Sequence, residues 1–294
     1  MVRLSMWVYA VLLLLIGAST AVWAGEPNLP AGFRQIGSID FSNWPAQNWY
    51  TREKAAADWN PRLYNGEERI NFNGIVHYRA MVVDNSPLGK HALRVLLPRD
   101  KISPAHTGIQ IFADIGGYEE VYFGYSLYLP PDFSCGREVK LPPGIYGGWK
   151  FATGGVRPNG VSIGPSIRMV IQECYASSYV YHLGLAGGAG DSYGEKFAWM
   201  NRQGRQEKIG KGVKHDIMFN AAMNVPGKKN GSHKVWLDGA PVLSLNALEL
   251  RRSEELKFDT VGVEIFRGGG NMSYAAGRDS TLDVTEFKVW VREY

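Results

Sequence analysis

Apolar and polar residues alternate along most of this 294-residue chain with the two-residue period of β-strands. In the segment EEVYFGYSLYLP (119–130), apolar residues from Val121 to Leu129 recur at every second position and would share one face. Such a pattern predicts a strand that is buried on that face. Other segments with strand-like composition are HALRVLLP, SIRMVI, SYVYHLGL, HDIMFNAAMNV, KVWLDGAPVLSL, TVGVEIF and LDVTEFKVWV.

Turn-forming residues separate these segments, and helix signals are scarce. Pro130-Pro131-Asp132, Asn230-Gly231 and Asp238-Gly239 are turn sequences, and the chain has 35 glycines and 15 prolines. The best helical candidate is the short segment TREKAAAD (51–58). The pattern predicts an all-β fold, an antiparallel β-sandwich of the jelly-roll type, as one domain over residues 36–294.

The first 24 residues have the pattern of a secretory signal. Arg3 is the one charge there, an apolar run extends from Met6 to Ile16, and Val22-Trp23-Ala24 fits a signal-peptidase site. The run is short for a membrane span, so an uncleaved anchor is the weaker alternative. We therefore expect an exported protein, periplasmic or extracellular, with no membrane attachment after cleavage. Residues 25–35, rich in Pro and Gly, are expected to form a flexible leader.

Composition and cysteine content indicate which kinds of partner and cofactor to expect. The formal net charge is +4 and the pI is about 8.9, which favours an anionic partner. No dense Lys/Arg run of the kind typical of nucleic-acid binding is present. Cys135 and Cys174 either form one disulfide or stay free, and neither they nor the six histidines have metal-site spacing. We predict no metal and no cofactor.

The segment SIRMVIQECYASSYVY (166–181) gathers four polar side chains. On a strand, Ser166 and Arg168 share a face, and Tyr179 and Tyr181 share a face on the next strand. If the connection between them has an even number of residues, an antiparallel hairpin places the arginine beside one of the tyrosines. The same spacing would also arise in a well-packed hairpin whose Tyr–Arg contacts are purely structural.

Such a cluster suits the chemistry of uronic-acid polymers. A guanidinium pairs bidentately with a carboxylate, and a tyrosine beside a cation is expected to have a lowered pKa and to transfer protons. In β-elimination the C5 proton of a uronate is removed and the 4-linked oxygen leaves, while the carboxylate must be neutralised. The hairpin is thus a candidate active site.

Four further segments carry a family resemblance. They are EEVYFGYSLYLPPDF (119–133), VKLPPGIYGGWKF (139–151), MNVPGKKNGSHKVWLDG (223–239) and FRGGGNMSYAAGRDS (266–280). In this order, around the Ser-x-Arg and Tyr-x-Tyr strands, the chain resembles polysaccharide lyase family 14 and its relatives, the glucuronan lyases, over roughly residues 85 to 291. The resemblance implies a jelly-roll sandwich that cleaves alginate or polyglucuronate by β-elimination.

The resemblance also implies the catalytic residues. The family's lysine corresponds to Lys140, its Ser-x-Arg to Ser166 and Arg168, and its two tyrosines to Tyr179 and Tyr181. Arg168 and Lys140 would neutralise uronate carboxylates, one tyrosine would act as general acid or base, and Ser166 would orient the substrate or the tyrosine. The stretch that begins at Lys140 has one residue more than the family pattern.

Other polar or aromatic residues are candidates for substrate binding. Glu120 shares a face with a tyrosine of its strand, Trp149 and Lys150 follow a Gly-Gly pair, and Arg267 precedes three glycines on an expected mobile loop. We expect a monomer whose partner is an acidic polysaccharide, with alginate before polyglucuronate.

Two other functions stay open. A non-catalytic polysaccharide-binding protein of the cell envelope would keep the same fold. A glycoside hydrolase of the same architecture needs two carboxylates across the scissile bond. The nearest match to the hydrolase pattern has Asp283 and Glu286 but lacks the first carboxylate.

Overall fold

The computed structural model describes residues 29–59, 63–64, 67–68, 74–89, 91–185 and 193–292. The predicted signal peptide (1–24) and the first residues of the predicted leader (25–28) lie outside the described residues. Within the described part of the chain, no helix has the length and apolarity that a membrane span requires.

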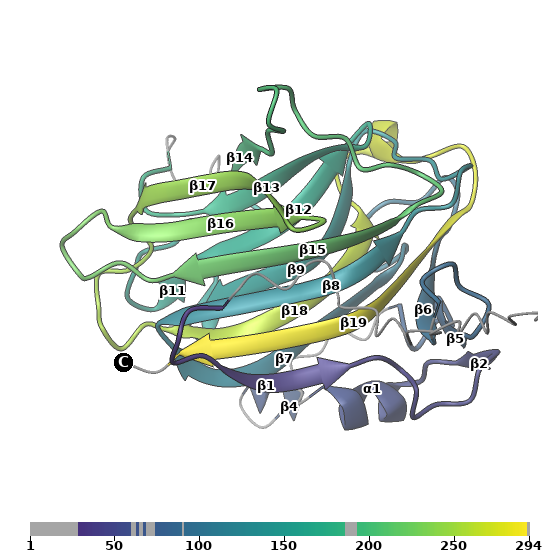
Figure 1. Cartoon of the computed structure of the whole chain (residues 1–294), viewed down its shortest axis with the longest axis horizontal. Helices are drawn as coiled ribbons and strands as arrows, with labels where there is room; N and C mark the ends of the chain where they lie inside the picture. The colour runs from purple at the N-terminus through teal and green to yellow at the C-terminus, as the bar shows by residue number, and fades with distance from the viewer. Residues whose placement is uncertain are drawn as a thin grey trace, which may run out of the picture.

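Two antiparallel sheets face each other in a sandwich, as predicted (Figure 1). The larger sheet has the order β17-β16-β15-β8-β19-β6-β5-β2, with β1 paired to β19. Its strands are β1 (Arg34–Ile39), β2 (Asn48–Trp49), β5 (Ala80–Val83), β6 (Ala92–Leu97), β8 (Glu120–Tyr128), β15 (Lys214–Ala222), β16 (Gly231–Leu237), β17 (Ala240–Leu248) and β19 (Ser280–Arg292).

The second sheet, called here the smaller sheet, has the order β14-β13-β12-β9-β18-β7. Its strands are β7 (Ile109–Tyr118), β9 (Val139–Gly147), β12 (Ser166–Gln172), β13 (Tyr175–Tyr181), β14 (Glu195–Ala198) and β18 (Phe258–Arg267). The small elements are α1 (Arg52–Asp58), β3 (Leu63–Tyr64), β4 (Glu67–Glu68), β10 (Lys150–Phe151), β11 (Ile163–Gly164) and η1 (Met272–Tyr274). The predicted helix is thus confirmed as α1, capped at its start by Thr51.

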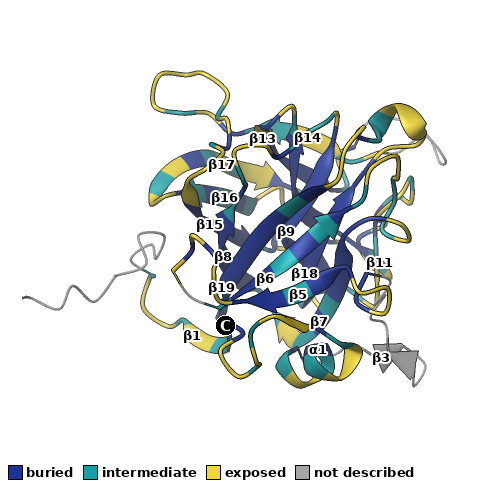
Figure 2. Ribbon diagram, turned by 90° about the vertical axis from the view of Figure 1, so that its right-hand side faces the viewer, coloured by how far each residue is buried: buried dark blue, intermediate teal, exposed yellow. Residues whose placement is uncertain are grey.

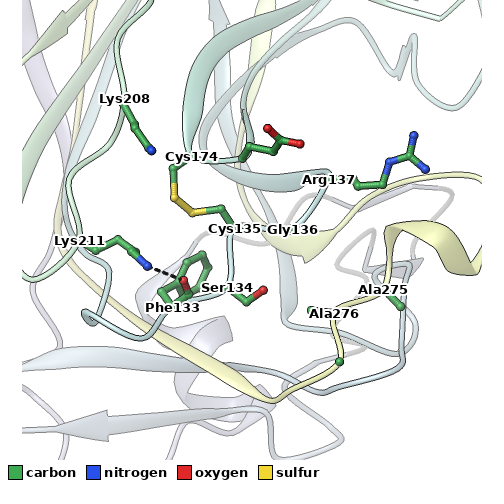
Figure 3. A pocket seen from close by; sticks show the side chains of 12 residues that line it. Phe133, Ser134, Cys135, Gly136, Arg137, Cys174, Lys208, Lys211, Ala275 and Ala276 are labelled. Carbon is green, nitrogen blue, oxygen red and sulfur yellow. Dashed lines mark hydrogen bonds between the residues drawn. A yellow bond between two sulfur atoms is a disulfide. The ribbon is translucent and has the colours of Figure 1, made fainter.

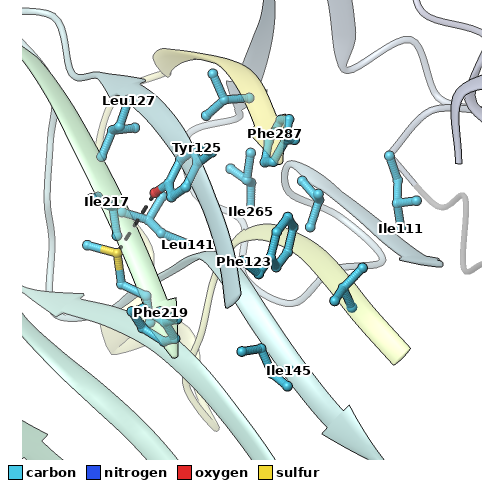
Figure 4. Close-up of a cluster of buried hydrophobic side chains, with 14 of the residues drawn as sticks. Ile111, Phe123, Tyr125, Leu127, Leu141, Ile145, Ile217, Phe219, Ile265 and Phe287 are labelled. Carbon is cyan, nitrogen blue, oxygen red and sulfur yellow. Dashed lines mark hydrogen bonds between the residues drawn. The ribbon is translucent and has the colours of Figure 1, made fainter. Parts of the chain in front are cut away.

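One hydrophobic core fills the space between the sheets (Figures 2 and 4). The alternating residues of β8 from Val121 to Leu129 are all buried in it, as the sequence pattern predicts. Tyr125 of β8 stacks on Phe287 of β19 with ring centroids 5.4 Å apart, and its hydroxyl reaches the sulfur of Met169 on the opposite sheet. Burial of these inner faces is the main force that holds the two sheets together.

Strand β1 begins within residues 25–35, the segment that the sequence predicts to be a flexible leader. Arg34 already pairs with Val291 in the β1–β19 ladder, and Phe33 meets the Tyr122 ring edge-on at 4.9 Å. Leu29 and Phe33 therefore pack on the outer face of the larger sheet. The prediction of a flexible leader was based on the Pro and Gly content and did not take into account the apolar side chains of Phe33 and Leu29.

Cys135 and Cys174 form a disulfide, which decides between the two alternatives left open by the sequence. The bond joins the segment before β9 to the turn between β12 and β13. Its partners are 39 residues apart in sequence. A crosslink of this kind restricts the unfolded chain and stabilises the folded state.

We predict that Cys174→Ser lowers the free energy of unfolding by about 2–4 kcal/mol, because the 39-residue loop is no longer closed in the unfolded state. Denaturant titration with and without reductant measures this. Reductant should destabilise the wild-type protein and leave the variant unchanged. Equal stabilities of the two proteins under oxidising conditions would contradict the prediction.

Candidate active site

The hairpin of β12 and β13 has the register that the sequence analysis required. A two-residue turn, Glu173-Cys174, closes it, and Arg168 lies directly opposite Tyr179. Ser166 lies opposite Tyr181. The intervening apolar residues of β12 point into the core, so the four polar side chains share the outer face of the smaller sheet. The predicted grouping is therefore present.

Arg168 lies at the centre of this face and is only 4% exposed. Its guanidinium carbon lies 5.2 Å from the ring centroid of Tyr179 and 5.5 Å from that of Tyr181. One terminal nitrogen is 3.5 Å from a carboxylate oxygen of Glu264 and 3.4 Å from the hydroxyl of Thr153. Its Nε has no hydrogen-bond partner among the described residues. A buried donor without a partner is costly, which makes it a candidate contact for a bound anion.

Glu264 of β18 holds the other side of the guanidinium. Gln110 donates to one of its carboxylate oxygens at 2.6 Å, and the Tyr146 hydroxyl donates to the other. Burial is the largest single influence and lowers the pKa of Arg168, but the charge of Glu264 and smaller contributions from Tyr146, Tyr181 and Tyr179 together raise it. The arginine is thus a permanent buried cation, and the hydrogen-bonded carboxylate of Glu264 fixes its position.

Lys140 of β9 forms the second cationic centre. Its Nζ lies 2.8 Å from one carboxylate oxygen of Glu138, and Lys196 of β14 donates to the other oxygen at 2.8 Å. The same Nζ lies 3.8 Å from the ring centroid of Tyr179. Burial, together with repulsion from Arg168, lowers the pKa of Lys140 to about 8, and the ion pair with Glu138 opposes this shift. The amine can therefore lose its proton close to neutral pH.

Tyr179 and Tyr181 form a hydrogen-bonded pair. Their hydroxyl oxygens are 3.2 Å apart, and the backbone N–H of Gly194 donates to the Tyr179 oxygen at 3.1 Å. Burial and the hydrogen bond with Tyr181 raise the pKa of Tyr179, although Arg168 acts in the opposite direction. Our expectation of a lowered tyrosine pKa is wrong here, because desolvation outweighs the nearby cation. A protonated tyrosine is suited to donate a proton rather than to accept one.

The extra residue after Lys140 lies in a bulge of β9. Leu141 pairs with Met169 and Gly144 pairs with Arg168, so Pro142 and Pro143 have no partners in the β9–β12 ladder. Proline lacks the N–H that a central ladder requires, and a bulge accommodates it. Because the bulge contains two residues, Lys140 keeps the same face as Arg168.

Ser166 forms a hydrogen bond with the backbone next to the cluster. Its fully buried hydroxyl donates to the carbonyl oxygen of Ala152 at 2.6 Å. The next residue, Thr153, is the one that contacts Arg168. The serine therefore orients the segment that flanks the guanidinium, whereas the sequence analysis gave it a direct role in orienting substrate or a tyrosine.

Two of the four predicted substrate-binding residues lie near the cluster. Lys150 starts the short strand β10 and is exposed, and Trp149 before it is 60% exposed. Phe151 of the same strand packs on Tyr146 with centroids 4.4 Å apart, which locates β10 at the Tyr146 end of the cluster. Both residues are placed where they can contact a polymer.

The other two do not belong to this site. Glu120 lies on β8 in the opposite sheet, where it accepts from Asn220 and pairs with Arg292. Arg267 ends β18 rather than standing on a loop, is fully buried, and donates to the Ser134 carbonyl and the Ser280 hydroxyl. For Glu120, strand parity gave the face of the strand but not the sheet. For Arg267, the glycines that follow it indicated a loop, whereas strand β18 continues to this residue.

Sequence reasoning missed several residues of the cluster. Glu138 stands two positions before Lys140, at same-face spacing, and Glu264 interrupts the apolar strand TVGVEIF. In both cases the signal was a charged residue within a strand that is otherwise apolar. Lys196, Tyr146 and Gly194 carry no such signal, because strand pairing alone brings them to the site. No group of three or more His, Cys, Asp or Glu residues in the described part of the chain could hold a metal ion.

Comparison with protein-family models identifies the family of this chain. A family model described as polysaccharide lyase 14 matches residues 85–287, which is more than half of the chain and includes every member of the cluster. The chain belongs to this family. The resemblance stated from the sequence is confirmed, and the protein is a polysaccharide lyase. A search of curated protein sequences finds no match to it.

Solved structures share the fold at low sequence identity. Alginate lyase Aly36B is 21% identical with a TM-score of 0.68, over 87% of this chain and 96% of that chain. The PL-14 alginate lyase from Aplysia kurodai is 19% identical with a TM-score of 0.68, over 87% of this chain and 98% of that one. An endo-1,3-β-glucanase from Streptomyces sioyaensis is 13% identical with a TM-score of 0.54, over 92% and 100%. The fold thus accommodates both lyases and hydrolases.

We predict that Lys140 titrates with a pKa of about 8 in the folded lyase. In Glu138→Gln its pKa should fall further, because the carboxylate that stabilises the ammonium is gone. NMR titration of the lysine side-chain carbons measures this, with Lys140→Met assigning the signal. In the control Glu249→Gln, which removes a carboxylate paired with Arg252 outside the cluster, the Lys140 pKa should not move. A pKa near 10 for Lys140 would contradict the prediction.

Proposed function

We propose that this lyase cleaves a polyuronate by β-elimination, with alginate as the first substrate and polyglucuronate as the second. The observation that carries the proposal is the buried pair of cations, Arg168 and Lys140, beside two hydrogen-bonded tyrosines. The alginate lyases of like fold support the substrate class. An anionic sugar supplies the negative charge that the two cations attract.

Arg168 is the residue that we assign to the substrate carboxylate. Its unpartnered Nε and its planar guanidinium allow a bidentate contact with that group. Neutralising the carboxylate stabilises negative charge that develops at C5. Because Glu264 and the tyrosine rings already hold the guanidinium, little conformational entropy is lost when substrate binds.

Lys140 in its neutral form is the base that we assign to the C5 proton. The electron pair of the C5–H bond then forms the C4=C5 double bond, and the C4–O4 bond breaks. The Tyr179–Tyr181 pair gives a proton to the leaving O4 oxygen. These roles follow from the opposite pKa shifts of Lys140 and Tyr179. Turnover should therefore increase as the pH rises through about 8, where Lys140 loses its proton.

We further propose that the protein acts as an exported monomer in an oxidising compartment. The Cys135–Cys174 disulfide supports this, because such bonds persist outside the reducing cytosol. The apolar N-terminal segment of the sequence supports it independently.

The two carboxylates that best match the hydrolase pattern do not lie on this face. Asp283 lies on β19 of the larger sheet, where Arg94 binds both of its oxygens at 2.8 Å. Glu286 of the same strand accepts from Ser126. Both carboxylates are thus engaged inside the opposite sheet, away from the cationic cluster.

The proposal is tested by incubating the purified lyase with polymannuronate, polyguluronate, alginate and glucuronan. An elimination product has a double bond conjugated to the carboxylate, so near-ultraviolet absorbance should rise on at least one polymer. If folded protein leaves all four unchanged, the proposed reaction is wrong and the binding-protein alternative is favoured.

We predict that Lys140→Met, Tyr179→Phe and Tyr181→Phe each reduce kcat by about 10²–10⁴-fold, the range for loss of a general acid or base. Each variant should keep the wild-type circular dichroism spectrum. Tyr118→Phe is the matched control, since that hydroxyl accepts from Arg34 outside the cluster, and it should retain full activity. Near-normal rates in all three test variants would remove this cluster from the mechanism.

A further inference from the structure

A second basic site lies at the turn end of the β12–β13 hairpin. A cavity of about 590 Å³ is formed there by segments from four parts of the chain (Figure 3). They are the segment before β9, the turn between β12 and β13, the segment before β15 and the segment after η1. Its lining includes Arg137, Lys208 and Lys211.

The walls of the cavity are fixed by covalent and backbone bonds. The Cys135–Cys174 disulfide joins two of them, and Figure 3 shows it between the two lysines and Arg137. The N–H of Glu173 donates to the Gly136 carbonyl at 3.0 Å, and the N–H of Ile209 donates to the Cys174 carbonyl at 3.0 Å. The cavity is therefore largely preformed, which reduces the entropy lost when a ligand binds.

The charges that line it are not balanced. Arg137 donates to the hydroxyl of Ser273, and Lys211 donates to the carbonyl of Phe133, so both bond neutral acceptors. Among the described residues, neither these two nor Lys208 has a carboxylate within salt-bridge distance. Glu173 is the one acidic residue in the lining. Three cations against one carboxylate make an anionic ligand favourable here.

A second hollow of about 510 Å³ adjoins the first and shares Lys208 with it. It adds Arg205, Glu207 and the ring of Tyr175, which is 40% exposed and lies 5.3 Å from the Lys208 ammonium. The two hollows together are therefore lined by four cations and two carboxylates. Tyr175 closes the hairpin opposite Gln172 and, by strand parity, shares the outer face with Tyr179. An exposed aromatic ring beside cations suits a sugar ring that carries a carboxylate.

We propose that the two hollows together form an accessory binding site for a segment of the acidic polysaccharide, separate from the catalytic cluster. The Arg168–Tyr179 pair is four positions from the closing pair of the hairpin, which is roughly 13 Å along a strand. A polymer held here raises the local concentration of cleavable chain at the cluster. The identity of the ligand rests on the proposed function, whereas the site rests on the cavity and its charges.

The test compares Lys208→Glu with the control Lys229→Glu, which makes the same charge change at an exposed lysine on the loop between β15 and β16. Binding is measured by retardation in native gels that contain alginate or glucuronan. Kinetics are measured on the polymer and on a uronate tetrasaccharide. We expect Lys208→Glu to raise the apparent Kd and the polymer KM by about 5–10-fold, as expected when a contact residue reverses charge. Its tetrasaccharide kinetics and those of Lys229→Glu should match the wild type.

The outcomes separate this site from the proposed reaction. Weaker polymer binding in Lys208→Glu than in Lys229→Glu supports the site even if no polymer is cleaved. Equal binding by the two variants overturns it. Inorganic phosphate that displaces the polymer at the same concentration of charge also overturns it, because the site would then be a small-anion site.

Discussion

The proposed active site depends on two buried cations held on one face of a β-sheet. Arg168 and Lys140 are each almost fully buried, and isolated charges at such depth would not be tolerated. Glu264 offsets the first and Glu138 offsets the second, with Lys196 sharing Glu138. The remaining unneutralised positive charge is what makes the face attractive for an anionic polymer. Burial, with repulsion from Arg168, lowers the pKa of Lys140.

The sandwich supplies the precision that this arrangement needs. β12 lies between β9 and β13 in the sheet, so its arginine is flanked by the lysine strand on one side and the tyrosine strand on the other. The two-residue turn at Glu173-Cys174 sets the hairpin register, and the disulfide anchors that turn. A shift by one residue would move every polar side chain of the hairpin into the core. The hydrophobic core on the opposite face therefore enforces the geometry of the site.

Much of this could be predicted from the sequence, because strand parity is a local property. The faces of β8 and of the β12–β13 hairpin follow directly from alternation. The grouping of Arg168 with the tyrosines also requires a connection with an even number of residues, which the two-residue turn supplies. Parity does not say which sheet a strand joins, so Glu120 was placed on the wrong side of the sandwich. Arg267 was expected on a mobile loop because three glycines follow it, whereas it ends β18 and is buried. The raised pKa of Tyr179 depends on burial, which only the packed structure reveals.

The β9 strand shows a different limit. Two adjacent prolines argue against a central strand by residue propensity, so β9 could not be predicted that way. The bulge at these prolines explains why the lysine still lies on the same face as Arg168. The family resemblance named Lys140 correctly as part of the cluster, whereas Glu138 and Glu264 had to be found from the contacts that they make. Long-range partners of this kind are invisible to periodicity because the sheet order is not sequential.

The most direct test of the account is a structure of Lys140→Ala bound to a uronate oligosaccharide of the polymer that the wild type cleaves. The account predicts a sugar carboxylate on the Arg168 guanidinium. The C5 atom of that sugar should face the space left by the lysine, and the glycosidic O4 should lie within hydrogen-bond distance of a tyrosine hydroxyl. An oligosaccharide held at its cleavable bond by other residues, with no contact to Arg168, would contradict it.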